Sequence, residues 1–215
     1  MWQILFLHAD FVAINKPCGI PVHAEEGGIS LTRTLAAQLG VPRVWLVHRL
    51  DKPTSGVLLL ALNEATASSL AQQFADKTMR KTYLALSRSK PAKKQGWVKG
   101  GMAKARRGAW KLTREGGAAA VTQFHSFALG GGLRLFVLHP HTGRTHQLRV
   151  AMKSLGSPIL GDTLYGGEDA PKMFLHAWRI VFSHRGQTFD ISTPPDDAWP
   201  SETAALLAQT RAADS

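Results

Sequence analysis

The sequence predicts an α+β fold built around a mainly antiparallel sheet. Strand-like patterns follow one another along the chain with few helices between them, and short glycine-containing turns at residues 130–132 and 185–186 separate two pairs of strands. The length of 215 residues is enough for one domain with a well-formed core and short for two. We therefore expect a single sheet with helices and loops on its faces.

The N-terminal part is predicted to contain strands and then a helix. Residues 1–15 have the apolar character of one or two strands that end before an Asn-Lys-Pro turn. Ser30 is a favourable N-cap for a helix to about Leu39, because leucines recur there at four-residue spacing. Gly40 then ends the helix.

A strand, a helix and another strand are predicted next. Residues 57–62 are almost entirely apolar, which indicates a strand buried on both faces. Asn63 can cap a helix that runs to about Lys77. Residues 82–86 form the following strand, with Tyr83 near its start.

The remaining elements lie beyond residue 118. They are strands at 119–127, 133–138, 178–183 and 187–192, a helix from Arg144 to Leu155, and a last short helix capped by Ser201, after which the chain end is expected to fray.

The net charge of +11 is concentrated in the centre of the chain. Between Lys77 and Gly161 there are seventeen Lys or Arg and one acid, whereas the rest of the chain holds nine basic and fourteen acidic residues. Residues 88–118 carry ten of the basic residues, have no clean periodicity, and are predicted to be a mobile hairpin or loop. Such a tract is typical of a polyanion-binding site, although a solvated basic face is the alternative.

Composition limits the cellular context. A single cysteine, Cys18, allows no internal disulfide, which suits a reducing compartment. Neither a signal-peptide pattern nor an apolar run of membrane-spanning length is present in the sequence. We therefore expect a cytoplasmic protein without a membrane partner.

Residues 48–56, His-Arg-Leu-Asp-Lys-Pro-Thr-Ser-Gly, precede the apolar strand and place Asp51 in a basic, turn-prone segment. Arg49 and Lys52 favour the ionised carboxylate, which could act as nucleophile, base or ligand. The alternative is that Asp51 only caps a turn, because Asp, Ser and Gly are ordinary turn residues.

Four ordered segments carry a resemblance to a known family, and the match extends from about residue 9 to about residue 193. Residues 48–56 are similar to the H-R-L-D-x-x-T-S-G signature of RluA-type RNA pseudouridine synthases. Residues 15–23 resemble the N-K-P-x-G motif of this family, and residues 81–85 resemble the segment that carries its active-site Tyr. Residues 139–149, together with 156–166, resemble its third motif.

The resemblance implies a bent, mixed sheet crossed by an active-site cleft, and an isomerase that needs no cofactor. Asp51 would be the catalytic carboxylate, acting at the sugar through C1′ or through loss of the C2′ proton. Tyr83 would stack on the uracil ring or take a proton, although a half-buried strand aromatic is the alternative. Arg149 stands at the position of the family's active-site Arg and would pair with Asp51 in a bidentate bond. A second carboxylate is not expected in the site, because acids are almost absent from the central region.

The RNA substrate implies a set of phosphate and base contacts. Arg144, His146 and Gln147 are expected on the first turn of a helix, whose N-terminus favours phosphate. Further RNA-binding candidates are His48, Arg49, Thr54, Arg106 and Arg107, with Trp97 and Trp110 as stacking or packing aromatics. Ala151 stands where the family often has His, which we expect to remove a peripheral contact.

Two other functions compete with this interpretation. The first is a zinc enzyme, which the nine histidines, including His139 and His141, suggest. No Cys pair, His-Glu-x-x-His motif or acid cluster accompanies these histidines, so no metal site is predicted. An RNA-binding or chaperone protein that has lost catalysis is the second alternative, and the presence of Asp51, Tyr83 and Arg149 argues against it.

The expected organisation is one catalytic domain over residues 1–198 and a short helix and tail over 199–215. Many relatives carry an N-terminal S4-type RNA-binding domain, for which this sequence has no room. The expected partner is an rRNA or tRNA loop with a flipped uridine, bound by a monomer.

Overall fold

The computed structural model describes residues 1–23 and 30–213, which form one eleven-stranded sheet with four α-helices and two short 3-10 turns. The strands are β1 (Gln3–Leu7), β2 (Phe11–Lys16), β3 (Trp45–Leu46), β4 (Ser55–Ala61), β5 (Arg80–Ser87), β6 (Gln95–Lys104), β7 (Trp110–Thr113), β8 (Ala118–Gly130), β9 (Leu133–Pro140), β10 (Leu175–His184) and β11 (Gln187–Ser192). The helices are α1 (Leu31–Leu39), α2 (Glu64–Ala75), α3 (Gln147–Ser154) and α4 (Glu202–Ala213), and the 3-10 turns are η1 (Arg106–Gly108) and η2 (Thr163–Tyr165).

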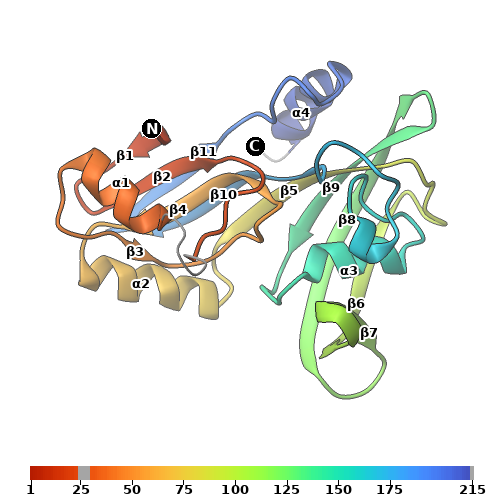
Figure 1. Cartoon of the computed structure of the whole chain (residues 1–215), viewed down its shortest axis with the longest axis horizontal. Helices are drawn as coiled ribbons and strands as arrows, with labels where there is room; N and C mark the ends of the chain where they lie inside the picture. Colours follow the sequence, from red (N-terminus) through yellow and green to blue (C-terminus); the bar gives the residue numbers. More distant parts are fainter. Residues whose placement is uncertain (24–29, 214–215) are drawn as a thin grey trace.

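The sheet is mixed and mainly antiparallel, as expected. Its strand order is β1-β2-β4-β10-β5-β9-β8-β6-β7, with β3 also paired to β4 and β11 to β10. The pairing of β10 with β4 is parallel and the other pairings are antiparallel. Figure 1 shows that β2, β4 and β10 run across the view while β6 and β8 descend, so the sheet bends. The prediction of an α+β fold is confirmed.

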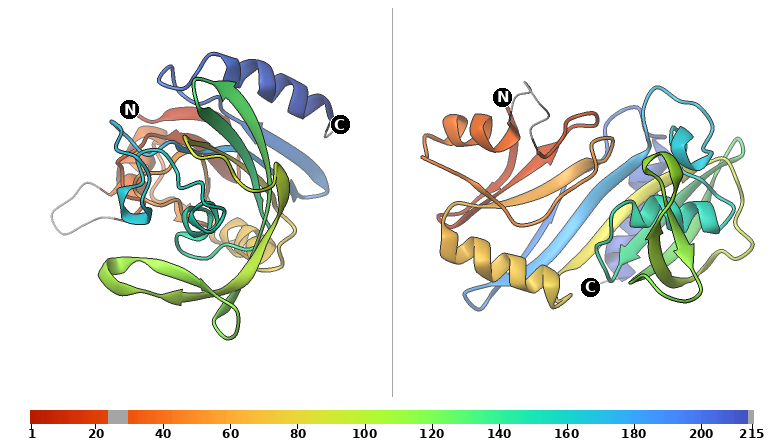
Figure 2. Two further views of the ribbon diagram at one scale, coloured as in Figure 1. Left: turned by 90° about the vertical axis from the view of Figure 1, so that its right-hand side faces the viewer. Right: turned by 60° about the horizontal axis from the view of Figure 1, so that its bottom comes forward.

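At one end of the sheet, α1 and α2 cover opposite faces of β2 and β4 (Figure 2). Alternate residues of the two strands face each helix: Leu58 packs with Leu35 of α1, and Leu59 packs with Leu70 of α2. Both predicted caps are present, because the Asn63 side chain accepts the Thr66 N–H and Ser30 accepts the Arg33 N–H. The strand predicted to be buried on both faces is therefore confirmed.

The other half of the sheet repeats this arrangement with α3 and α4. On β5, Ala85 packs in a cluster with Leu148 of α3, whereas Leu84 packs in a cluster with Leu207 of α4. Tyr83 lies where the α1 cluster meets the α3 cluster, so the face that carries α1 and α3 also carries the candidate site.

The basic segment at residues 88–118 is more ordered than the sequence predicts. The hairpin interpretation is correct and the loop interpretation is wrong, because β6 pairs along its length with β8 and also with β7. Trp97, Lys99 and Gly101 lie on this paired strand. The sequence of β6 lacks the apolar–polar alternation that predicts a strand, because basic residues occupy part of it. The strand lies near the edge of the sheet, where exposed residues alternate with partly buried ones.

One helix boundary and one helix cap differ from the predictions. The third helix begins at Gln147 and not at Arg144, because His146 adopts left-handed φ and ψ of 56° and 17° immediately before it. The fourth helix follows Ser201 directly, although the Ser201 hydroxyl bonds to the Glu202 carboxylate and not to a backbone N–H. Residues 214–215 of the predicted frayed end lie outside the described residues. Within the described part of the chain, no helix is long and apolar enough to span a bilayer.

Candidate active site

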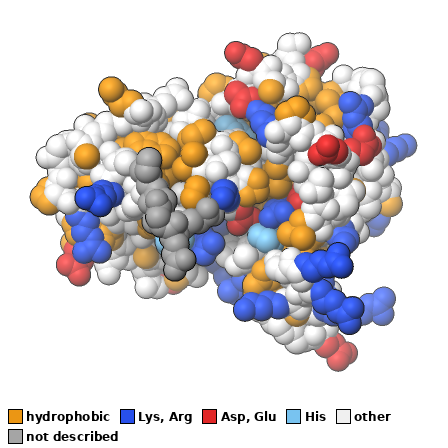
Figure 3. All heavy atoms as spheres, viewed as in Figure 1, with side chains coloured by type: hydrophobic (Ala, Val, Ile, Leu, Met, Phe, Trp, Pro, Cys, Tyr) orange, Lys and Arg blue, Asp and Glu red, His pale blue; other side chains and the backbone are white. Residues whose placement is uncertain are grey.

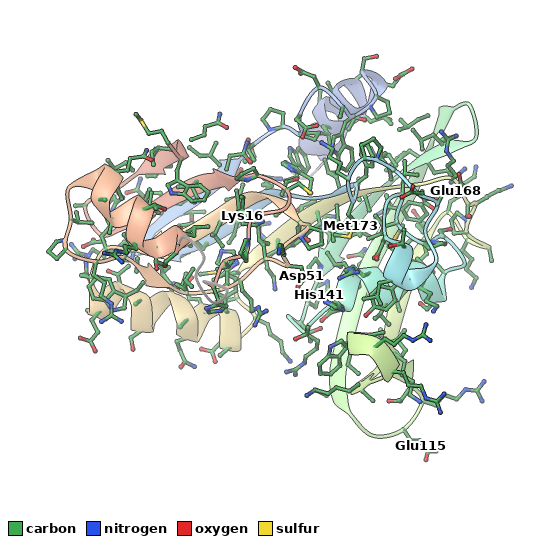
Figure 4. The ribbon with its side chains drawn as sticks, in the orientation of Figure 1. Lys16, Asp51, Glu115, His141, Glu168 and Met173 are labelled. Carbon is green, nitrogen blue, oxygen red and sulfur yellow. The ribbon has the colours of Figure 1, made fainter. Side chains whose placement is uncertain are left out.

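The Asp51 loop connects β3 to β4 and presents its carboxylate at an open cavity. The Asp51 carbonyl accepts the Thr54 N–H at 2.9 Å, so the backbone forms the turn that the residue types suggest. The carboxylate itself is half-buried and has no hydrogen-bond or ion-pair partner among residues 1–23 and 30–213. Figure 4 shows Asp51 near the middle of the molecule, between the two ends of the sheet. The side chain is therefore free to contact a substrate.

Lys16 holds this loop from behind (Figure 4). Its side chain is fully buried, and Nζ donates to the carbonyl oxygens of Pro17 at 2.9 Å, Ile20 at 2.7 Å and Lys52 at 3.2 Å. Burial lowers the pKa of Lys16 to about 8, and the nearby charge of Asp51 opposes that shift. The buried ammonium thus joins the Asn-Lys-Pro turn to the loop that carries Asp51, a positioning role that the sequence analysis did not assign.

One open cavity of about 120 Å³ collects most of the predicted site residues. Among the described residues that line it, Asp51 is the only acid, and Arg49, Lys81, Arg144 and Arg149 supply basic groups. The predicted residues on its wall are Arg49, Asp51, Thr54, Tyr83, Arg144, His146, Gln147 and Arg149. In Figure 3 a red side chain at the centre of the molecule lies among blue ones, which continue toward the projecting β6–β7 hairpin. We call this the Asp51 cavity below.

Tyr83 lies on β5, opposite Leu138 of β9, and forms part of the cavity wall. Burial, with a smaller contribution from the charge of Asp51, raises the pKa of Tyr83 well above its usual range. The phenol is therefore protonated at neutral pH. This favours stacking or hydrogen-bond donation over a role as phenolate base.

The predicted pair between Arg149 and Asp51 is wrong. Arg149 bonds instead to Asp162 through two hydrogen bonds of 2.8 and 2.7 Å, and Asp162 is only 2% exposed. The guanidinium also lies over the Tyr165 ring, 4.8 Å from its centroid. Asp51 is the one acid among the described lining residues, but a second carboxylate, that of Asp162, lies directly behind Arg149.

Gln147 is an internal support and not an exposed RNA contact. It is 6% exposed, and its Oε1 accepts from Thr142 Oγ1 at 2.7 Å and from the Arg144 N–H at 3.0 Å. Its Nε2 donates to Val121 and Thr122 on β8. All four contacts bind the loop before α3 to the sheet. The predicted RNA-binding role of Gln147 is therefore wrong for its side-chain amide, which is fully used inside the protein.

His146 connects the cavity to the basic hairpin. Its Nδ1 lies 2.8 Å from Tyr165 Oη, which also accepts the Trp110 N–H at 2.9 Å, so a chain of hydrogen bonds joins His146 to β7 of the hairpin. Burial lowers the pKa of His146, and the charge of Asp51 acts in the opposite direction. The imidazole is thus oriented toward the same cavity as Asp51.

His48 does not provide a cationic phosphate contact. Its Nε2 accepts the Leu59 N–H at 2.9 Å, and its ring stacks on Phe74 with centroids 4.5 Å apart. Burial, followed by the charge of Lys81, lowers the pKa of His48 to about 3. The ring is therefore neutral and cannot supply a charged contact to phosphate, and the RNA-binding role of His48 stays a prediction.

The other predicted RNA contacts fall into different environments. Thr54 is 2% exposed at the floor of the cavity, whereas Arg106 and Arg107 are exposed in η1 at the tip of the hairpin. Trp97 is 50% exposed, lies 5.0 Å from the His141 ring and carries Lys99 over its face. Trp110 instead packs against the cluster around Tyr165. Trp97 therefore fits the stacking interpretation and Trp110 the packing interpretation.

The histidine pair that raised the zinc alternative does not converge on a third ligand. His139 lies 3.3 Å from Thr82 Oγ1, and His141 contacts Trp97. Within the described residues, the group with metal-like spacing is His8, Asp10 and His184. Its carboxylate already bonds to Asn63, His184 and the Arg185 guanidinium, so these groups form a hydrogen-bonded network.

Ala151 is 3% exposed on α3 and does not line the cavity. The residues that the sequence analysis missed are Lys16, Lys81, Asp162 and Tyr165. All four lie inside the segments that carry the family resemblance. That position was the available signal, but the sequence could not show which side chains they contact.

The fold identifies the class of protein. The structure superposes on human RNA pseudouridylate synthase domain containing 1 with a TM-score of 0.78 and 26% identity, over 97% of this chain and 94% of that one. Human RNA pseudouridylate synthase domain containing 4 gives a TM-score of 0.76 and 27% identity, over 91% of this chain and 89% of that one. The fold is thus that of RNA pseudouridylate synthases.

The sequence relatives agree. Residues 10–154 match the RNA pseudouridylate synthase family, to which the chain belongs. An uncharacterized RNA pseudouridine synthase of Haemophilus influenzae is 50% identical over 90% of this chain and 87% of its own length. Ribosomal large subunit pseudouridine synthase C of Rickettsia bellii is 37% identical over 85% of this chain and 64% of its own length. The protein is an RluA-type RNA pseudouridine synthase, an isomerase that converts uridine in RNA to pseudouridine.

Proposed function

We propose that this enzyme isomerises a specific uridine in a structured rRNA or tRNA loop, with Asp51 as its catalytic carboxylate. The observation that carries the proposal is the Asp51 carboxylate, which within the described part of the chain has no hydrogen-bond or ion-pair partner and is the only acid on the wall of the Asp51 cavity. The reaction breaks the C1′–N1 bond, rotates the base and forms a C1′–C5 bond. The C5 proton is lost and N1 gains one, so the product is an isomer and no cofactor is needed.

Asp51 acts at the sugar, where cleavage develops positive charge that a carboxylate stabilises. Two routes remain compatible with its position, addition to C1′ and removal of the C2′ proton. Tyr83, held as a protonated phenol, stacks on or donates to the uracil ring. Arg149 does not orient Asp51 by a direct bond. Through its pair with Asp162 it supports the wall of the cavity that Tyr83 also lines.

The target uridine has to leave its stack to reach Asp51. Flipping is least costly where stacking is already broken, and unpaired loops display bases that a protein can read. The exposed Trp97 at the start of the basic hairpin offers a stacking surface for such a base. The name of the Rickettsia bellii relative assigns that protein to the large ribosomal subunit, which favours rRNA without excluding tRNA. We propose that the enzyme acts as a monomer.

RNA affinity is expected to depend steeply on salt, because the basic hairpin neutralises phosphates. Each phosphate contact to single-stranded RNA contributes about 0.7 to the slope of log affinity against log salt. Reversing both charges at Arg106 and Arg107 to Glu should reduce that slope by about 1 to 2 units and weaken binding at low salt. Filter binding of an rRNA or tRNA transcript over a series of salt concentrations measures both quantities.

The matched control reverses Arg33 and Arg43, which are exposed near α1 at the other end of the sheet. This variant has the same net charge and should retain the wild-type slope. An equal loss in both variants would mean that net charge alone determines affinity, and an unchanged slope in the Arg106 and Arg107 variant would show that the hairpin does not contact phosphate.

A further inference from the structure

A second cavity opens beside the Asp51 cavity and shares part of its wall. It has a volume of about 350 Å³, and we call it the side cavity. Arg49, Lys81, Tyr83 and residues 142–144 line both cavities, so a group in one lies next to a group in the other. Asp51 itself does not line the side cavity.

The side cavity is strongly basic. Four of its lining residues are Arg49, Lys77, Lys81 and Arg144, and none of the lining residues that the structure describes is Asp or Glu. Cations gathered without acids in a concave surface favour an anion. A phosphodiester is the anion that a uridine held at Asp51 brings with it.

Lys81 differs from the other buried lysine in what it contacts. Lys16 donates to three carbonyl oxygens, whereas Lys81 Nζ has one long hydrogen bond, 3.4 Å to the Thr142 carbonyl. Within the described part of the chain, the Lys81 ammonium therefore lacks hydrogen-bond partners that would compensate its loss of water. Consistent with this, burial lowers the pKa of Lys81 to about 8. An arriving phosphate oxygen would supply such a partner.

The remaining wall of the side cavity is aromatic. Phe74 on α2 stacks on the neutral His48 ring, and Lys81 Nζ lies 5.8 Å from the Phe74 ring centroid. Val47 and Ala75 complete the apolar part of the lining. The side cavity thus has an apolar part and a cationic part. These suit the two parts of a nucleotide, because the base or sugar is less polar than the charged phosphate.

We propose that the side cavity binds the nucleotide next to the target uridine in the RNA chain, with its phosphate at Lys81 and its base or sugar against Phe74. This inference rests on the proposed function. It implies that the enzyme contacts at least two consecutive nucleotides within its catalytic domain, apart from any contact made by the hairpin.

The test measures binding of fluorescein-labelled pentauridylate to the full-length protein by fluorescence anisotropy. Lys81→Met should weaken binding about tenfold, as expected for one charge-assisted hydrogen bond in a partly buried site, and should lower the salt slope by about 0.7. Arg33→Met removes the same charge from the exposed face of α1 and should leave binding unchanged.

Urea unfolding distinguishes a binding role of Lys81 from a structural one. Because Lys81→Met removes a poorly paired buried charge, we expect wild-type stability or better, whereas a structural Lys81 would give a less stable protein. If Lys81→Met does not fold, the exposed Lys77→Glu should still bind pentauridylate at least threefold more weakly than Arg33→Glu.

Binding equal to that of the matched Arg33 variant would overturn the side-cavity proposal, whether or not the protein turns RNA over. The proposed function fails in a different way, by absence of tritium release from rRNA and tRNA labelled at uridine C5 with the wild-type protein. The two failures are therefore separable.

Discussion

Asp51→Asn is expected to reduce pseudouridine formation by at least about 100-fold, because an amide can neither add to C1′ nor remove the C2′ proton. RNA affinity should stay within a few-fold of wild type, since the amide has nearly the same shape and the basic groups around the cavity are unchanged. Tritium release from RNA labelled at uridine C5 measures turnover, and filter binding of the same RNA measures affinity.

The matched control is Asp169→Asn, which removes an exposed carboxylate outside the cavity. It should retain wild-type turnover. An Asp51→Asn protein that kept more than about a hundredth of the wild-type rate would contradict a nucleophile or base role for Asp51. Loss of turnover together with loss of RNA binding would indicate that Asp51 serves binding.

Arg149→Met is expected to lower the free energy of unfolding by about 3–5 kcal/mol, because it leaves the Asp162 carboxylate buried and unpaired. Arg149 and Asp162 have side chains only 8% and 1% exposed, so little water can replace the lost partner. Combining Arg149→Met with Asp162→Leu should restore much of the stability, because no buried charge remains. Urea denaturation followed by circular dichroism gives each value.

The chain offers a control with the same geometry and a different environment. Arg179 and Asp190 form a bidentate pair of 2.8 and 2.7 Å between β10 and β11, where the carboxylate side chain is 43% exposed. Arg179→Met should cost only about 0–1 kcal/mol. Equal costs for the Arg149 and Arg179 variants would show that burial does not determine the strength of the Asp162 pair.

Elements with a local signal could be predicted from the sequence. Ser30, Asn63 and Gly40 mark helix ends through interactions within a few residues, and the structure confirms all three. The apolar β4 and the glycine turn between β8 and β9 were predicted for the same reason. The sequence also indicated which residues gather at the site, because loops that follow strands of one sheet meet at its face.

Features that depend on distant partners could not be predicted. The bidentate pair of Arg149 is made with Asp162, which lies one residue beyond the acid-poor segment that suggested a single carboxylate. Gln147 and His48 look like RNA contacts in their motifs, but their partners on β8 and β4 turn them inward. The β6 strand was missed because its partner β8 provides the pairing that its own residues do not signal.

The most direct test of the account is to map pseudouridines in the rRNA and tRNA of a strain that lacks this gene. The deletion strain is complemented either with the wild-type gene or with Asp51→Asn, and carbodiimide-stop sequencing reads every site. The account predicts that pseudouridine disappears from one or a few uridines in structured loops, and that only the wild-type gene restores it. Loss confined to unstructured mRNA, loss at no site, or restoration by Asp51→Asn would contradict it.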